Sequence, residues 1–315
     1  MATYKIAGLG EVLWDVYEDG KYLGGAPANF ALHTRHLGAE GIIISRVGQD
    51  ALGKELLALL EQWGVETDTI QIDAQKPTGT VHVQLDAQGV PTFTCSQDVA
   101  FDYLQFDEKL KMLLPQLDAV LFGTLTQRNR IARETVQHVL DEMEEALVVF
   151  DINLREIGPQ TEAILTESLQ KTHILKINDA ELQLLQKIFH AASQRQDDFL
   201  HGLLEKFSLR LVCVTLGEKG CYCQSATERY YSPGFRIQPV DTTGAGDAFI
   251  AAFVVSYLEH QPLPQTMEFA NAEGALVATR KGAVPSYERQ EIEQFLQKCE
   301  ERNIDEQFQG YGDAI

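Results

Sequence analysis

The sequence predicts an α/β fold: a three-layer α/β/α sandwich with a mostly parallel central sheet, plus a small second sheet that forms a lid. From about residue 106 to residue 220, short buried strand-like runs alternate with helical stretches. That alternation is typical of a parallel sheet covered by helices on both faces. Residues 12–23 and 78–95 have an extended pattern instead, which predicts the small sheet. We therefore expect one domain over residues 1–315 with the lid inserted in it.

The individual elements follow from the hydrophobic pattern. Short apolar runs predict strands at 4–9, 42–47, 119–122, 147–150, 174–177 and 211–215. Longer periodic stretches predict helices at 50–63, 130–145, 161–169, 180–189, 199–207, 248–257, 266–280 and 288–300. Pro27 suits the first position of an additional early helix, and Asp50 suits the cap of the helix at 50–63. We expect the polar end of the chain, residues 303–315, to be mobile.

Composition and charge argue against several classes of protein. Of the 315 residues, 46 are acidic and 26 basic, for a net charge of −20. So acidic a chain is a poor partner for nucleic acids or anionic membranes, and no apolar run approaches the ~18 residues of a membrane span. The start has no secretory signal pattern, and the five cysteines lack metal-finger spacing. Free thiols are typical of a reducing compartment, so we expect a soluble cytoplasmic protein.

The stretch Asp241-Thr242-Thr243-Gly244-Ala245-Gly246-Asp247 directly precedes the apolar helix expected at 248–257. It predicts a turn into a helix N-terminus, where Gly244 and Gly246 let a ligand approach the backbone. The first amides of a helix lack internal partners and carry the positive end of its dipole, so such a turn binds an anion, most often phosphate. Asp247 would repel that anion, which makes sense if it removes a proton from a second substrate. The alternative is that Asp247 only caps the helix.

Polar residues near the first strand suggest a second ligand. Glu11 and Asp15 follow that strand, at the edge where α/β sheets bind ligands. Gly24 and Gly25 make a tight turn into the next helix, and Asn29 lies one turn inside it. An amide donates and accepts hydrogen bonds, which suits a sugar hydroxyl, although a local bond to the backbone explains Asn29 equally well.

A dinucleotide-dependent oxidoreductase is the weaker enzyme alternative. Gly8-Leu9-Gly10 follows the first strand, but Leu13 stands where the dinucleotide fingerprint needs a third glycine. We therefore reject that interpretation.

Further polar residues follow the later strands of the expected sheet. Asp151, Asn153 and Arg155 come after one strand, and Asn178 and Glu181 after the next. The Asn178/Glu181 spacing fits a capping box; it also fits an amide and a carboxylate that help to hold Mg²⁺ beside phosphates. Later positions of the same kind are Thr215, Gly217 and, within an Ala-rich helix, Asn271.

Together these motifs resemble the ribokinase-like, phosphofructokinase B-type family of carbohydrate kinases. The resemblance extends from Gly8 to about Ser286 and includes the turn at 24–29, the Asn178/Glu181 pair, the segment 214–220 and the motif at 241–247. It implies an ATP-dependent kinase in which Asp247 is the base and the anion hole consists of Gly244, Ala245 and Gly246. The sugar-binding residues that it implies are Asp15, Gly25, Ala26, Asn29, Asn153, Arg155 and Asp247. The implied nucleotide residues are Asn178, Glu181, Thr215, Gly217, Lys219, Gly220, Gly246 and Asn271, of which Asn178 and Glu181 also serve Mg²⁺, partly through water.

Within the family, three motifs look like the fructokinase branch: Gly-Glu-x-x-x-Asp at 10–15, Gly-Gly-Ala-Pro-Ala-Asn at 24–29 and Asp-x-Asn-x-Arg at 151–155. Ribokinases usually carry Lys where this chain has Ala26. We expect D-fructose to be converted to fructose 6-phosphate. The alternatives are 2-keto-3-deoxygluconate kinase, since Arg155 suits a carboxylate substrate, and ribokinase. A catalytically silent sensor of the same fold is the non-enzyme alternative, and the presence of Asp247 with both glycines argues against it.

Asp241 raises the question of a monovalent cation. A carboxylate beside an anion hole needs a positive neighbour, and no Lys or Arg lies between residues 237 and 279. The resemblance implies a K⁺ site formed by Asp241, Thr243, Val277, Arg280, Gly282 and Ser286. The alternative is an ion pair of Asp241 with Arg280 or Lys281. We also expect two lids to pair in a homodimer, because a small isolated sheet is marginal in water and its edges invite pairing.

Overall fold

The computed structural model describes residues 3–85, 91–154, 157–308 and 310–311. Its centre is a ten-stranded sheet in which neighbouring strands from β5 to β11 run parallel and the remaining three are antiparallel. In sheet order the strands are β14 (Arg302–Asn303), β13 (Arg229–Phe235), β12 (Gly220–Gln224), β11 (Leu211–Thr215), β10 (Ile174–Asn178), β9 (Leu147–Asp151), β8 (Ala119–Phe122), β1 (Lys5–Leu9), β4 (Glu40–Gly48) and β5 (Ile70–Asp73). The expected mostly parallel sheet is confirmed.

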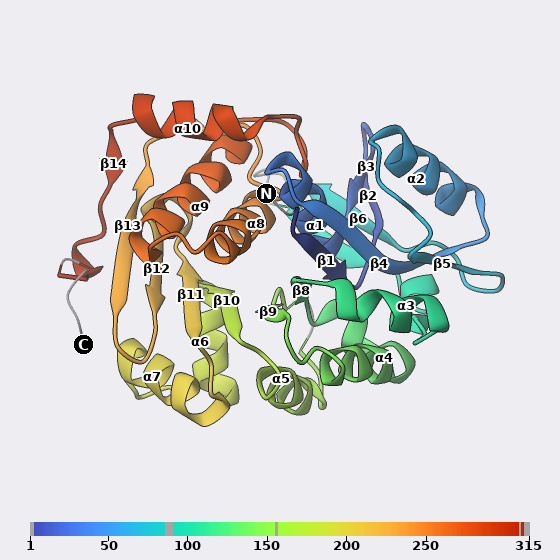
Figure 1. Ribbon diagram of the computed structural model, residues 1–315, viewed down its shortest axis with the longest axis horizontal. Helices are drawn as coiled ribbons and strands as arrows, with labels where there is room; N and C mark the ends of the chain where they lie inside the picture. Colours follow the sequence, from blue (N-terminus) through green and yellow to red (C-terminus); the bar gives the residue numbers. More distant parts are fainter. Residues whose placement is uncertain (1–2, 86–90, 155–156, 309, 312–315) are drawn as a thin grey trace.

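Helices cover both faces of this sheet, so the three-layer prediction is also confirmed (Figure 1). On one face lie α1 (Ala26–His36), α8 (Ala245–Leu258), α9 (Leu263–Ala278) and α10 (Arg289–Lys298). On the other lie α3 (Glu108–Leu113), α4 (Arg130–Asp141), α5 (Thr161–Leu169), α6 (Asp179–Ile188) and α7 (Gln196–Phe207), while α2 (Ala51–Gln62) packs beside β4. Short 3₁₀ turns are η1 (Ala100–Tyr103), η2 (Leu114–Gln116), η3 (Leu125–Arg128), η4 (Gly217–Lys219) and η5 (Glu306–Phe308).

Helix α8 is the most enclosed helix on its face. Its residues 248–256 are all buried, as expected for a helix that is apolar on every side. It packs against both α1 and α9 on this face of the sheet (Figure 1). Tertiary packing therefore fixes the position of its N-terminus, the expected anion-binding turn.

A second, four-stranded sheet has the order β3-β2-β6-β7. Its strands are β2 (Leu13–Tyr17), β3 (Gly20–Gly24), β6 (Thr80–Leu85) and β7 (Pro91–Cys95). Each consecutive pair is antiparallel, and a parallel pairing of β2 with β6 joins the two halves. This confirms the expected small sheet; the turn between β6 and β7, residues 86–90, lies outside the described residues.

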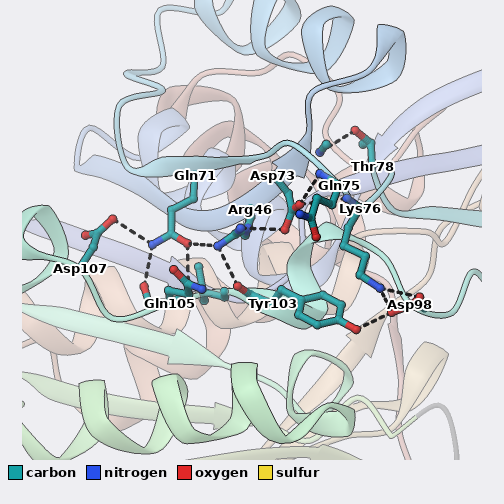
Figure 2. Close-up of polar contacts among 12 residues, drawn as sticks. Arg46, Gln71, Asp73, Gln75, Lys76, Thr78, Asp98, Tyr103, Gln105 and Asp107 are labelled. Atoms are coloured by element: carbon teal, nitrogen blue, oxygen red, sulfur yellow. Dashed lines mark hydrogen bonds and ion pairs between the residues drawn. The ribbon is translucent and has the colours of Figure 1, made fainter.

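Polar contacts fix the chain segments that lead into and out of the β6–β7 hairpin (Figure 2). Asp73 forms an ion pair with Arg46 at 2.7 Å and accepts a hydrogen bond from the backbone of Lys76. The Lys76 ammonium then bonds Asp98 at 2.6 Å, and Asp98 also accepts from the Tyr103 hydroxyl. The two segments on either side of the hairpin are thereby linked to each other and to β4.

The expected mobility of residues 303–315 is wrong for residues 303–308. Strand β14 pairs with β13, and Phe308 is buried with its ring 4.6 Å from that of Tyr222. Burial of an aromatic side chain against an apolar strand stabilises such a segment. The polar residues around Phe308 gave no sign of this burial in the sequence.

The five cysteines are free thiols, and three of them are buried in the core beneath α8. None of the described helices has the length and apolar character needed to cross a bilayer. Within the same described ranges, no cluster of three or more His, Cys, Asp or Glu side chains is arranged to hold a metal ion.

Candidate active site

The turn into α8 has the geometry that the glycine motif predicts. Gly244 is the N-cap residue with φ of 78°, and among the described residues no side chain caps the helix. A Cβ at Gly244 would lie 2.0 Å from the carbonyl oxygen of Ala283, so both the backbone conformation and the close approach require glycine. Ala245 and Gly246 line a cavity of about 500 Å³. The first turn of α8 is therefore open to a ligand in that cavity.

Asp247 and Asn29, which are 218 residues apart in the chain, meet beside this turn. The Asn29 Nδ2 group donates a hydrogen bond of 2.8 Å to Asp247 Oδ2. Asn29 is only 4% exposed, and among the described residues its Oδ1 atom has no hydrogen-bond partner. A buried acceptor without a donor is costly, and a ligand hydroxyl beside Asp247 would supply the missing donor. The expected base and an expected sugar residue thus share one site.

Six of the eight expected nucleotide residues line the 500 Å³ cavity: Asn178, Thr215, Gly217, Gly220, Gly246 and Asn271. Asn271 also donates to Ser232 Oγ at 2.9 Å and to the Pro233 carbonyl at 2.9 Å, so it ties α9 to β13. Glu181 and Lys219 do not line the cavity. The Lys219 ammonium instead pairs with Asp305 at 3.0 Å. This pairing was not expected, because Asp305 belongs to the segment that was predicted to be mobile.

Asn178 and Glu181 form a complete capping box at the start of α6. Asn178 Oδ1 accepts from the Glu181 amide at 2.8 Å, and Glu181 Oε2 accepts from the Asn178 amide at 2.8 Å. Glu181 Oε1 accepts from the Leu154 amide at 3.2 Å. Burial and the nearby Asp151 carboxylate raise the pKa of Glu181. The capping interpretation is therefore confirmed, and it leaves any Mg²⁺ contact of Glu181 to lone pairs that these amides do not use.

Lys176 is a functional residue that the sequence motifs did not reveal: a buried lysine near Gly246 of α8 and Glu181 of α6. Its Nζ atom lies 2.9 and 3.1 Å from the two carboxylate oxygens of Asp151, and a Cβ added at Gly246 would lie 3.2 Å from it. Burial disfavours the ammonium ion, but Asp151, Glu181 and Asp247 outweigh burial and raise the pKa of Lys176. The sequence did contain one indication of this residue. A lysine inside the apolar strand Ile174–Asn178 must be paired, because an unpaired buried charge is very costly.

Three of the expected sugar-binding residues, Asp15, Gly25 and Ala26, lie around the start of α1. Gly24 lies against Asp15, because a Cβ there would meet Asp15 Oδ2 at 2.2 Å. Gly25 caps α1 with φ of 106°, and Ala26 is its first residue. Asn153 follows β9 with φ of 39°. Arg155 lies outside the described residues.

Two glycines near the first strand have a packing role. A Cβ at Gly8 would meet the Pro27 carbonyl oxygen at 1.9 Å, and one at Gly10 would meet the Pro27 ring at 2.8 Å. Both glycines therefore let α1 approach β1, which explains their spacing without a dinucleotide.

Asp241 is held by backbone amides. Its two carboxylate oxygens accept from Thr243 and Gly282, each at 3.0 Å. Burial opposes its ionisation, but hydrogen bonds from Thr243 and Gly282 outweigh burial and keep the pKa of Asp241 below its usual range. It shares a small cavity of about 80 Å³ with Asp15, Thr243 and Gly282, among other residues.

The two basic residues near Asp241 have other partners. Arg280 bonds Glu291 at 2.6 Å and the Ser286 carbonyl at 2.5 Å, and its amide donates to the Val277 carbonyl. Lys281 pairs with Asp19 at 3.3 Å. In the described part of the chain, no ion pair joins Asp241 to either of them.

Comparison with known proteins agrees with this geometry. The model of the pfkB family of carbohydrate kinases matches residues 2–290. A Pyrococcus horikoshii protein assigned as a sugar kinase is 33% identical over 306 residues, which are 91% of this chain and 94% of that protein. Fructokinase-1 of Oryza sativa subsp. japonica is 32% identical over 277 residues, or 84% of each chain. The chain therefore belongs to the pfkB family of carbohydrate kinases, which are phosphotransferases.

Solved structures share the fold. A crystal structure of the P. horikoshii sugar kinase in complex with ATP has a TM-score of 0.76 at 28% identity and covers 94% of this chain and 99% of that one. The crystal structure of Xylella fastidiosa fructokinase with bound ATP has a TM-score of 0.83 at 23% identity, with coverage of 93% and 98%. The ribokinase-like fold class is thus confirmed.

Proposed function

We propose that this protein transfers the γ-phosphate of ATP to a primary hydroxyl of a small sugar, with D-fructose converted to fructose 6-phosphate. One observation carries the proposal: Asn29 donates to Asp247 beside the uncapped α8 turn, which itself lines the 500 Å³ cavity. A carboxylate acceptor of protons and an open helix N-terminus thus lie side by side. Phosphoryl transfer needs this combination of positioning and charge stabilisation.

In the proposed mechanism, Asp247 accepts the proton of the attacking sugar hydroxyl, as a general base does. Asn29 orients that carboxylate through Nδ2 and offers Oδ1 to a sugar hydroxyl. The first turn of α8 stabilises the charge on the transferring phosphoryl group. Lys176, which pairs with Asp151, places a positive charge close to Gly246. The 500 Å³ cavity would hold the nucleotide.

Magnesium is part of this proposal. Mg²⁺ prefers oxygen ligands and usually keeps several waters, and it would neutralise charge on the ATP phosphates. Both Glu181 oxygens and Asn178 Oδ1 already accept backbone hydrogen bonds. These oxygens therefore suit contact with Mg²⁺ through water better than direct ligation.

We also propose a cytoplasmic location, because the free thiols suit a reducing compartment.

Fructose is favoured by the motifs at 10–15, 24–29 and 151–155 and by the similarity to a plant fructokinase. The test is an ATP-dependent phosphorylation panel with fructose, ribose, 2-keto-3-deoxygluconate, tagatose and nucleosides. We expect fructose to give the highest kcat/KM. A clear preference for ribose or 2-keto-3-deoxygluconate would replace the substrate but keep the kinase. Thermal stabilisation by ATP and sugars without any turnover would support the silent sensor instead.

A K⁺ site near Asp241 remains our proposal, because Arg280 and Lys281 are engaged elsewhere. Its ligands would come from Asp241, Thr243, Val277, Arg280, Gly282 and Ser286. Oxygen ligands suit such a hard cation. Turnover is measured at fixed ionic strength in K⁺, Na⁺ and a bulky organic cation. We expect a K⁺ preference that Asp241→Ala abolishes, and equal rates in all three salts would contradict the site.

We further propose that the four-stranded sheet closes over the sugar and pairs with a second copy in a dimer. Among the described strands, the edge strands β3 and β7 have one neighbour each, and the edges of a small sheet invite pairing. Light scattering at micromolar concentration should give the mass of a dimer; a monomer alone would contradict the pairing.

A further inference from the structure

Directly behind the anion-hole turn lies a buried hydrogen-bonded chain of three side chains from three different segments. Glu273 belongs to α9, His33 to α1, and Tyr287 precedes α10. The Tyr287 hydroxyl contacts Glu273 Oε1 closely and lies 2.6 Å from His33 Nδ1. His33 Nε2 lies 3.0 Å from the carbonyl oxygen of Ala283. Glu273 and His33 are fully buried.

The far end of this chain contacts the proposed catalytic turn. The Ala283 carbonyl is the group that leaves no room for a Cβ at Gly244. The neighbouring amide of Gly282 donates to Asp241. Gly274, which follows Glu273 in α9, approaches the Ala245 carbonyl so closely that a Cβ there would lie 3.0 Å from it. The anion-hole turn is therefore contacted by the carbonyl that His33 bonds and by the residue that follows Glu273 in α9.

Through His33, the hydrogen-bonded chain is also tied to the sugar side of the site. His33 lies one helical turn after Asn29 on α1, and Asn29 bonds Asp247. A shift of α1 would consequently move both Asn29 and the support of Gly244. This arrangement can keep the base and the anion hole in register.

The donor and acceptor inventory determines where the protons lie. The Ala283 carbonyl can only accept, so His33 Nε2 must carry a proton. Burial, with a further contribution from His36, lowers the pKa of His33 to about 3, so the ring is neutral and Nδ1 is an acceptor. The Tyr287 hydroxyl must then donate to Nδ1, and its oxygen must accept from Glu273. Glu273 can donate only as a neutral carboxylic acid.

The surroundings of Glu273 agree with a neutral acid. Its second oxygen, Oε2, is buried and has no hydrogen-bond partner among the described residues, which an ionised carboxylate tolerates poorly. Burial raises the pKa of Glu273 well above its usual range, although the Tyr287 contact opposes this. The nearby cations have other partners: Arg289 pairs with Glu259 and Arg280 with Glu291.

We propose that Glu273, Tyr287 and His33 are positioning residues: Glu273, as a neutral hydrogen-bond donor, fixes the Ala283 carbonyl against Gly244 and thereby holds the anion-hole turn. This inference rests on the proposed function, because the turn matters only if phosphoryl transfer takes place there. Breaking this chain of hydrogen bonds should lower kcat. It should leave the KM values for ATP and sugar largely unchanged, since neither ligand is bound by these side chains.

The test compares Tyr287→Phe, Glu273→Leu, Glu273→Gln and a control. Tyr287→Phe breaks the chain, and we expect a fall in kcat of about tenfold from the loss of positioning. Glu273→Leu should act in the same way, whereas Glu273→Gln should recover most of the kcat because its amide can still donate to Tyr287. The control Tyr4→Phe removes another hydrogen-bonded phenol, which contacts the opposite end of α8 at Leu258, and should not change kcat.

An infrared difference spectrum adds a readout that needs no activity. The parent minus Glu273→Gln spectrum at neutral pH should contain the carbonyl band of a protonated carboxylic acid. Absence of that band, an unchanged kcat in folded Tyr287→Phe, or equal losses in Glu273→Gln and Glu273→Leu would each overturn the proposal. A parent enzyme that phosphorylates no sugar would instead refute the proposed function, and the infrared result would still decide the protonation of Glu273.

Discussion

Two helix N-termini meet at the candidate site, and they differ in how their first amides are satisfied. Helix α6 begins with a closed capping box, in which Asn178 and Glu181 accept hydrogen bonds from each other's amides. Helix α8 begins at Gly244, and no side chain in the described part of the chain caps it. Both termini lie at the same cavity, since Asn178 and Gly246 line it. A capped terminus is stable by itself, whereas an uncapped one leaves its amides for a ligand. We therefore place the proposed anion hole at α8 and not at α6, whose first amides are already satisfied.

The largest expected effect concerns Asp247 in the first turn of α8. Asp247→Asn keeps the shape of the side chain and removes the base, so we expect kcat to fall ~10²–10⁴-fold with binding of ATP and sugar nearly intact. Steady-state kinetics combined with calorimetric binding would measure both. Turnover within a few-fold of the parent would show that Asp247 is not the base.

Gly244→Ala should have the next largest effect. The added Cβ would collide with the Ala283 carbonyl in a backbone conformation that only glycine adopts easily, so the turn must shift and kcat should fall roughly 10²-fold, as when one oxyanion donor is removed.

The matched control for this change is Gly64→Ala. Gly64 has a similar φ of 71°, but a Cβ there would meet only the end of Arg35, at 3.6 Å. It should lose about 1–2 kcal/mol of stability from the strained backbone without a loss of kcat. Equal kcat for the two variants would mean that the α8 turn does not take part in catalysis.

The smallest effect is expected at the start of α6. Asn178→Ala removes the cap and should lower the free energy of unfolding by about 1 kcal/mol, whereas Asn178→Asp should retain it. Urea unfolding monitored by circular dichroism measures both. A KM for MgATP that rises in Asn178→Ala and is restored in Asn178→Asp would add a role in metal binding to the capping role. If Asn178→Ala were as stable as the parent, the capping role would be wrong.

Particular residues show how far the sequence could be interpreted. The regular alternation of strands and helices predicted the layered sheet, and the separate extended segments predicted the second sheet. The motif at 241–247 located the turn into α8, because glycine and a following apolar run are local signals. Asn178 and Glu181 were recognised as a cap for the same reason: three-residue spacing is a local property.

Other features depend on contacts between distant segments. In the sequence, Lys176 is a single polar residue within a strand. Only the fold brings it close to Asp151 and Gly246. The polar end of the chain contained no sign of the surface that Phe308 covers. His33, Glu273 and Tyr287 belong to three segments without any shared motif, so their chain of hydrogen bonds could not be predicted.

By itself, the sequence determined the α/β class, the family motifs and the glycines that form the turns into helices. These features are encoded over a few neighbouring residues, through backbone conformation and hydrophobic periodicity. Only the tertiary structure decided that Asn29 reaches Asp247 across 218 positions and that α8 is left uncapped at a cavity while α6 is closed. The physical reason is that hydrogen-bond partners and burial depend on how helices and strands pack, and packing is a property of the whole chain.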